Sequence, residues 1–191
     1  GTLVYSEGKR DSKCFALTYE RIYQRSFPTI DWSKFPHVTD HTIFSHVIRE
    51  HFQREVHEEE EVLFRSHYIE ELKMQRSVSP HYFRPVPGAV EMMQELQQRE
   101  RVVVGVATGG WADPARIKLE HVGIEHQTIV LEGGDGHPTR RHILQKAITR
   151  CQSSVEEFSK VVYVGDAVWD VETTREMQLD FIGVRRRHDH A

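Results

Sequence analysis

Two carboxylates four residues apart follow an apolar, β-branched segment near the end of the chain. The segment 161–164 reads Val-Val-Tyr-Val and is followed by Gly165, Asp166 and, four positions later, Asp170. Glycine allows the chain to turn sharply at this point, and carboxylate oxygens are the hard ligands that Mg²⁺ prefers. The pattern favours a metal site at a strand end, with Asp166 and Asp170 as ligands. The simpler alternative is that Asp166 only caps the helix that follows.

A hydroxyl group and two glycines end a second apolar segment. Residues 102–107 read Val-Val-Val-Gly-Val-Ala, and Thr108, Gly109 and Gly110 follow them. A threonine hydroxyl and freely approachable backbone N–H groups before a helix can hydrogen-bond a phosphate oxygen. A turn that needs glycine for its conformation alone explains the same residues. The two strand-end patterns together are therefore more informative than either is alone.

The second half of the chain alternates between helical and strand patterns. Continuous apolar runs, typical of strands buried on both faces, lie at 102–107, 161–164 and 181–184, with a shorter candidate at 128–131. Strand–helix–strand order predicts βαβ units and a parallel sheet, in which functional residues gather at the carboxyl ends of the strands. We therefore expect Thr108 and Asp166 at the same edge of one sheet.

The first half of the chain shows helical periodicity and hardly any strand signal. Thr39 and Asp40 offer an N-cap for an amphipathic helix whose apolar residues are spaced by three and four positions. We predict a small helical bundle over residues 11–78.

Composition narrows the class of protein. A chain of 191 residues suits one core domain with a small insertion, and 25 basic against 29 acidic residues give a net charge of −4. This charge argues against nucleic acid as a partner, and no apolar run is long enough to cross a membrane. The distant Cys14 and Cys151 predict free thiols in a reducing compartment. We expect a soluble cytoplasmic monomer or homodimer without membrane partners.

The two strand-end motifs together resemble the haloacid dehalogenase (HAD) superfamily, whose members are mostly Mg²⁺-dependent phosphatases. The flanking residues 107–111 and 164–170 are similar to the phosphoglycolate-phosphatase-like branch, and the opening Gly1-Thr2-Leu3 matches the end of that family's Asp-x-Asp-Gly-Thr-Leu motif. The resemblance covers essentially the whole chain. It implies a HAD-like Rossmannoid parallel sheet with helices on both faces, plus an inserted all-helical cap at 11–78. Residues 1–10 and 79–191 would then form the core domain.

The resemblance also implies roles for individual residues. Thr108 would bind the transferring phosphoryl group, helped by the backbone of Gly109 and Gly110. Asp166 would be a Mg²⁺ ligand. Asp170 would either ligate the metal or orient a basic residue of the third motif.

The third motif of the family normally contains a lysine, and this sequence departs from it. Residues 136–141 read Gly-His-Pro-Thr-Arg-Arg, without a lysine. We assign the role to Arg140 at the start of a helix, because a guanidinium neutralises phosphate charge as well as an ammonium does. His137 and Arg141 stay open as alternatives, as does an Arg140 that is only a surface cation.

The expected function is that of a Mg²⁺-dependent phosphatase of a small phosphorylated metabolite, acting through an aspartyl-phosphate intermediate. A haloacid dehalogenase needs no metal, and the Gly165-Asp166 pair argues against it. A phosphoglucomutase-like isomerase is a second alternative within the family. A binding module that kept the fold and lost the chemistry is the alternative outside enzymes.

Four other features receive simple interpretations. The acidic run at 57–61 is expected to be a solvated helix face, and the basic run at 185–190 a surface loop. The glycine-rich segment 133–136 is expected beside the active site. Trp169 is expected to pack under its loop, with a position facing the substrate as the alternative.

The nucleophile that the resemblance implies would precede the first residue. We therefore expect an apolar strand and an Asp-x-Asp motif immediately upstream of Gly1 in a longer protein, and Ala191 also arrives where the family usually continues. Intact mass of the expressed protein checks this expectation. A mass equal to that of these 191 residues would contradict it and favour the binding module.

Overall fold

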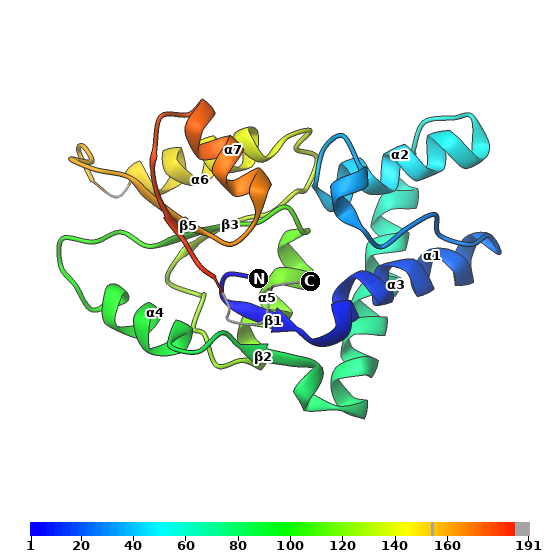
Figure 1. Ribbon diagram of the computed structural model, residues 1–191, viewed down its shortest axis with the longest axis horizontal. Coiled ribbons are helices and arrows are strands. Elements are labelled where there is room, and N and C mark those ends of the chain that lie inside the picture. The colour runs from blue at the N-terminus through cyan, green and yellow to red at the C-terminus, as the bar shows by residue number, and fades with distance from the viewer. Residues whose placement is uncertain (154, 186–191) are drawn as a thin grey trace.

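A computed structural model describes residues 1–153 and 155–185 as two groups of elements (Figure 1). Helices α1 (Arg10–Tyr23), α2 (Asp40–Phe52) and α3 (Glu58–Val78) gather on one side of the molecule. The other side holds α4 (Ala89–Gln97), α6 (Arg140–Gln152) and α7 (Val168–Glu176), and α5 (Ala112–His121) lies between the two groups. Short 3₁₀ turns occupy Glu7–Lys9, Trp32–Lys34 and Pro80–Tyr82.

The described strands form three pairs. Strand β1 (Val4–Ser6) is antiparallel to β2 (Phe83–Pro85). Strand β3 (Gly105–Ala107) is parallel to β4 (Val130–Glu132), and β5 (Val162–Gly165) is parallel to β6 (Asp180–Gly183). Parallel strands joined through helices confirm the predicted α/β class. They also bring the carboxyl ends of β3 and β5 to the same region.

The strands are shorter and more exposed than their sequences predict. β3 includes only the second half of the run at 102–107, and Val102, Val103 and Val162 are 39%, 38% and 42% exposed. The prediction that these strands are buried on both faces is therefore wrong. Among the described residues β3 pairs only with β4 and β5 only with β6, so each strand has one edge without a neighbour to cover its apolar side chains.

The helical segment forms as its sequence predicts. Thr39 caps α2, because its hydroxyl accepts a hydrogen bond of 3.1 Å from the backbone N–H of Thr42. Between residues 10 and 78 the described chain contains helices and no strand. The boundaries of a separate cap domain over residues 11–78 stay a prediction.

Two apolar cores hold the molecule together. The first consists mainly of aromatic and branched side chains of α1, α2 and α3. The second lies between α4, α5 and β4, and includes Met93, Leu119 and Leu131. The turn from β3 to α5 runs between the two cores.

Several smaller predictions can be compared with the structure. Glu60 and Glu61, expected on a solvated face, instead form hydrogen bonds with Tyr23 and Trp111, respectively, so that prediction is wrong for them. Both cysteines are buried, and neither forms a disulfide within the described residues. No helix of the described residues is long and apolar enough to cross a membrane. Of the basic run at 185–190, residues 186–190 lie outside the described residues.

A carboxyl group joins the helical segment to the turn after β3. The backbone N–H of Asp40 donates to the Gly109 carbonyl at 2.8 Å, and its Oδ2 accepts from the N–H of Trp111 at 3.0 Å. The pKa of Asp40 is raised to about 7. Burial is the main cause; the positive charge of Lys118 opposes it, and the negative charge of Asp11 adds to it. The carboxyl group of Asp40 therefore keeps its proton to a higher pH in the folded protein than it would in water.

Replacing Asp40 with asparagine is expected to stabilise the protein at high pH. In the folded state Asp40 keeps its proton up to a pH of about 7, whereas the unfolded chain loses it above about 3.8. The contribution of Asp40 to the free energy of unfolding therefore falls as the pH rises from about 3.8 to about 7, and it stays low above pH 7. In the Asp40→Asn variant the amide oxygen still accepts from Trp111 and the side chain carries no charge, so we expect a gain of about 2 kcal/mol at pH 8. This gain should be smaller at pH 4.5. Urea unfolding of the wild type and the variant at pH 8 and at pH 4.5 measures it, and an equal gain at the two pH values would contradict the raised pKa of Asp40.

Candidate active site

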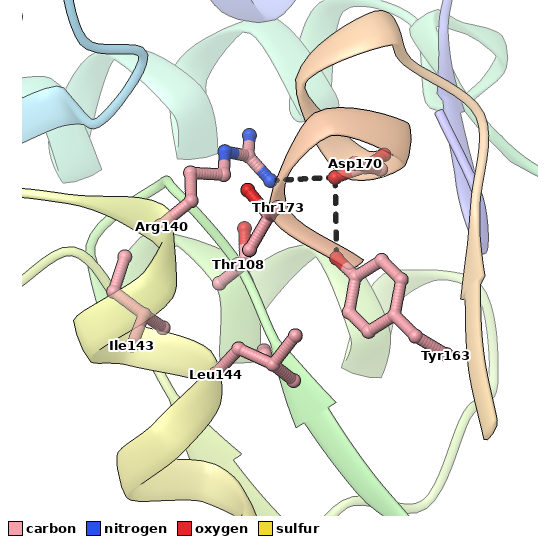
Figure 2. Close-up of a pocket in the computed structure, with 8 residues that line it drawn as sticks. Thr108, Arg140, Ile143, Leu144, Tyr163, Asp170 and Thr173 are labelled. Carbon is pink, nitrogen blue, oxygen red and sulfur yellow. Dashed lines mark hydrogen bonds and ion pairs between the residues drawn. The ribbon is translucent and has the colours of Figure 1, made fainter. Parts of the chain in front are cut away.

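Arg140 and Asp170 form an ion pair where α6 and α7 begin (Figure 2). The guanidinium Nη1 donates to Asp170 Oδ1 at 3.1 Å, and Nε donates to the carbonyl of Val38 at 3.1 Å. The Thr139 hydroxyl caps α6, which makes Arg140 the first residue of that helix. The guanidinium also lies 5.5 Å from the centre of the Trp169 ring, a cation–π arrangement. The side chain is thus held in one orientation by α7 and by the segment before α2.

Asp170 is only 4% exposed and accepts four hydrogen bonds. Its Oδ1 accepts from Arg140 and from the Tyr163 hydroxyl, at 3.1 and 3.2 Å. Its Oδ2 accepts from the backbone N–H groups of Asp166 and Ala167, at 3.2 and 3.1 Å. Burial, and then the charge of Asp170, raises the pKa of Tyr163. The buried charge of Asp170 is therefore balanced by donors on every side.

Thr108 ends β3 and faces the same region. Its backbone N–H donates to the carbonyl of Glu132 at 2.9 Å, and its Oγ1 accepts from the N–H of Gly110 at 3.2 Å. The Thr108 hydroxyl can still donate its own hydrogen to another acceptor. A small cavity of about 10 Å³, room for one water molecule, has eight lining residues: Ala107, Thr108, Arg140, Ile143, Leu144, Tyr163, Asp170 and Thr173.

The glycines of the turn after Thr108 serve close packing. A Cβ atom on Gly109 would lie 2.5 Å from the Val38 carbonyl oxygen and 2.7 Å from Arg140 Nη2. A Cβ atom on Gly134 would lie 2.4 Å from the carbonyl oxygen of Gly109. A side chain at either position would push apart the segments that hold Arg140. This confirms that the glycine-rich segment 133–136 lies next to the turn.

Asp166 stands apart from the cavity. Its carboxylate accepts from the hydroxyl of Thr2 at 2.8 Å, and the residue is exposed. It does not cap α7, since the N-cap position belongs to Ala167 and the carboxylate of Asp170 binds the N–H groups there. The structure thus brings Thr108, Arg140 and Asp170 together and leaves Asp166 at the rim.

Among the described residues, Asp166 is the carboxylate at the strand ends that is left to take part in holding a magnesium ion. Mg²⁺ takes six oxygen ligands, keeps several waters among them, and is usually bound through one or two carboxylates together with substrate phosphates. The oxygens of Asp170 already accept four hydrogen bonds, and Asp166 is a single carboxylate. The part of the chain that the structure describes contains no group of three or more side chains able to hold a metal ion. The geometry of Asp170 suits the other role considered for it, the orientation of the basic residue.

The alternatives to Arg140 lie elsewhere. Arg141 pairs with Glu176 at 2.5 Å on the surface, and the imidazole of His137 lies 3.5 Å from Lys146 Nζ. Neither residue lines the cavity. Among the three candidates, the geometry favours Arg140.

Tyr163 is a site residue that the sequence analysis did not single out. It belongs to the apolar run that forms β5, where it reads as one more core residue. Its position two residues before Gly165 places its hydroxyl beside Asp170, across the turn. A tyrosine within an otherwise aliphatic strand next to two aspartates was the available signal.

A second, larger groove lies on the side of the molecule that the helices α2 and α3 form. Its volume is about 820 Å³, and it runs along α2 and the start of α3 to residues 135 and 136. His41, which lines it, forms a 2.8 Å contact with Glu61 that raises the pKa of the imidazole. The groove shares no lining residue with the cavity at the strand ends.

One family model matches most of the chain. The family model described as haloacid dehalogenase-like hydrolase matches residues 6–184. No curated protein matches the chain significantly.

Solved structures with this fold include CbbY from Rhodobacter sphaeroides in complex with phosphate, at a TM-score of 0.71 and 14% identity, covering 100% of this chain and 86% of that chain. A predicted phosphoglycolate phosphatase from Haemophilus somnus 129pt has a TM-score of 0.64 and 15% identity, covering 96% and 80%. A hydrolase from Pseudomonas syringae has a TM-score of 0.67 and 14% identity, covering 95% and 80%. At these identities the likeness shows the fold.

Removing the charge of Asp170 is expected to destabilise the protein, unlike the same change at Asp166. Asp170→Asn turns one acceptor into an N–H₂ group that faces donors, and leaves Arg140 without its counter-ion. We expect a loss of about 2–4 kcal/mol in the free energy of unfolding. Asp166→Asn, at an exposed position, should change it by less than about 0.5 kcal/mol. Urea unfolding of both variants measures the difference, and similar losses would show that Asp170 is not the structural carboxylate.

Proposed function

Because this chain belongs to the haloacid dehalogenase-like hydrolase family, we propose that it hydrolyses phosphate monoesters of small metabolites. The membership confirms the resemblance found in the strand-end motifs. The observation that carries the proposal is the meeting of the Thr108 hydroxyl and the Arg140 guanidinium at one cavity, beside the carboxyl ends of β3 and β5.

These two side chains supply what a phosphoryl group needs. Thr108 has a hydroxyl proton to donate, and Arg140 has Nη hydrogens beyond the one that it donates to Asp170. Asp170 and the Val38 carbonyl hold the guanidinium in place before any ligand arrives. Donors that are already oriented stabilise developing charge without a cost of reorganisation. Arg140 at the start of α6 also adds to the positive end of the helix dipole.

The cavity is smaller than a phosphate group, so binding requires movement. The described residues bind and orient the phosphoryl group in this proposal, and no bond-making step is assigned to them.

The family and two solved structures of the same fold support the substrate class that we propose. One of these structures is a predicted phosphoglycolate phosphatase, and another contains phosphate. A small phosphorylated metabolite, with phosphoglycolate as the first compound to test, is consistent with both. The requirement for Mg²⁺ and the location in the cytoplasm stay predictions.

Removing the guanidinium of Arg140 is expected to weaken phosphate binding more than removing either neighbouring cation. Arg140→Ala should lower the affinity for inorganic phosphate by about 10- to 100-fold, the loss of a charge-assisted contact of ~1.5–3 kcal/mol. Arg141→Ala and His137→Ala, at positions outside the cavity, serve as controls and should change it less than threefold. Titration calorimetry measures the affinities. A larger effect of His137→Ala would show that the third motif lies three residues earlier.

The hydroxyl of Thr108 is tested in the same way. Thr108→Val is nearly isosteric and should impair phosphate binding and turnover of p-nitrophenyl phosphate by the complete protein while leaving the fold intact. Unchanged binding would mean that the turn exists for its glycines alone.

The metal requirement is tested by hydrolysis of p-nitrophenyl phosphate by the complete protein, which includes the expected upstream Asp-x-Asp motif, with and without Mg²⁺. If Asp166 is a metal ligand, Asp166→Asn lowers the metal-dependent activity by at least ~100-fold. Activity within a few-fold of the wild type would contradict that role. Phosphate binding without any turnover would refute the hydrolase and leave a phosphate-binding module.

A further inference from the structure

Trp111 belongs by sequence to the turn after β3, yet its ring lies in the aromatic core of the helices. The residue is 0% exposed. Its ring stacks on the ring of Phe15, with 5.6 Å between the ring centres. The ring centres of Phe64, Tyr68 and Phe44 lie 5.9, 6.2 and 6.3 Å from that of Trp111. Every other buried member of this first core, among the described residues, lies between positions 14 and 83. Trp111 is therefore a side chain from outside the helical segment that completes its core.

The neighbouring residue is anchored on the other side. Ala112 packs against the second core, which α4, α5 and β4 form. Two consecutive residues thus belong to two different cores. The turn that follows Thr108 therefore packs into both cores.

Hydrogen bonds fix the ring and its backbone to α2 and α3. The indole Nε1 donates to Glu61 Oε1 at 2.8 Å, and Glu61 is itself bound to His41 of α2. The backbone N–H of Trp111 donates to Asp40 at the start of α2. Because these partners sit on two helices, the ring cannot shift relative to one of them alone.

A further link runs through the glycine-rich segment. The backbone N–H of Ala112 donates to Asp135 Oδ2 at 2.8 Å, and Oδ1 of the same carboxylate pairs with Arg65 of α3. Moving the helices away from the turn would break these bonds and bring a large aromatic ring into water.

We propose that Trp111 is a positioning residue: it makes helices α1–α3 and the turn at 109–112 move as one body, so that the orientation of Thr108 depends on the packing around the ring. The consequence for Thr108 rests on the phosphate-binding role proposed above. The coupling between the helices and the turn does not.

Two core variants separate positioning from general stability. Phe64→Leu removes a ring that contacts Trp111 from α3, whereas Phe35→Leu removes a buried ring of the same core whose ring partners are not those of Trp111. Amide hydrogen exchange at 109–112 and calorimetric titration with inorganic phosphate are measured on both. We expect Phe64→Leu to speed exchange at the turn and to weaken phosphate binding about 2- to 30-fold. Phe35→Leu should leave the turn's exchange and the affinity within about twofold of the wild type.

Equal effects of the two variants on the turn would overturn the proposal, as would unchanged exchange at 109–112 in Phe64→Leu. If Phe64→Leu does not fold, Trp111→Phe takes its place, since it keeps a ring and loses only the indole and its bond to Glu61. Unchanged exchange at 109–112 in that variant would also overturn the coupling. A wild-type protein that binds no phosphate would refute the proposed function, while hydrogen exchange would still decide the coupling.

Discussion

The buried carboxylate of Asp170 determines how the strand ends, the helix starts and the basic side chain are arranged. A charge that is 4% exposed must have donors around it, and the fold supplies four: a guanidinium, a phenol and two backbone N–H groups. The two backbone donors fix the start of α7. The guanidinium comes from the start of α6, and the phenol from β5. Satisfying this one charge therefore aligns three elements, and it leaves Arg140 oriented towards the end of β3.

The turn at 109–112 carries the second constraint. It follows Thr108 directly, and its successive residues are bound to the helices on one side and to the α/β core on the other. The glycines permit this, because a side chain at Gly109 would collide with the carbonyl that holds Arg140. Phosphate recognition, as proposed, and the joining of the two parts of the molecule thus depend on the same few residues.

The sequence predicts much of this arrangement, and its failures have physical causes. The apolar runs indicate the parallel strands, and the threonine and aspartate at their ends indicate where the cavity forms, because parallel strands end at one edge. Burial is predicted less well: Val102 and Val162 read as core residues and are exposed, since burial depends on neighbouring strands that a local pattern does not reveal. Tyr163 and Trp111 were not singled out for the same reason. Each looks like an ordinary apolar residue until the partner across the fold, Asp170 or the helical core, is known.

Among the described residues, β3 and β5 each have one edge without a strand partner, and this has a consequence for handling this chain. An unpaired strand edge, with half-exposed valines in or just before the strand, is a template on which another chain can add a strand. Charges beside these edges oppose such pairing: Arg101 precedes one segment, and Lys160, paired with Asp180 at 2.9 Å, precedes the other. Solubility of this chain at high concentration therefore depends on a few cations near its strand edges, and it should decline as salt screens them.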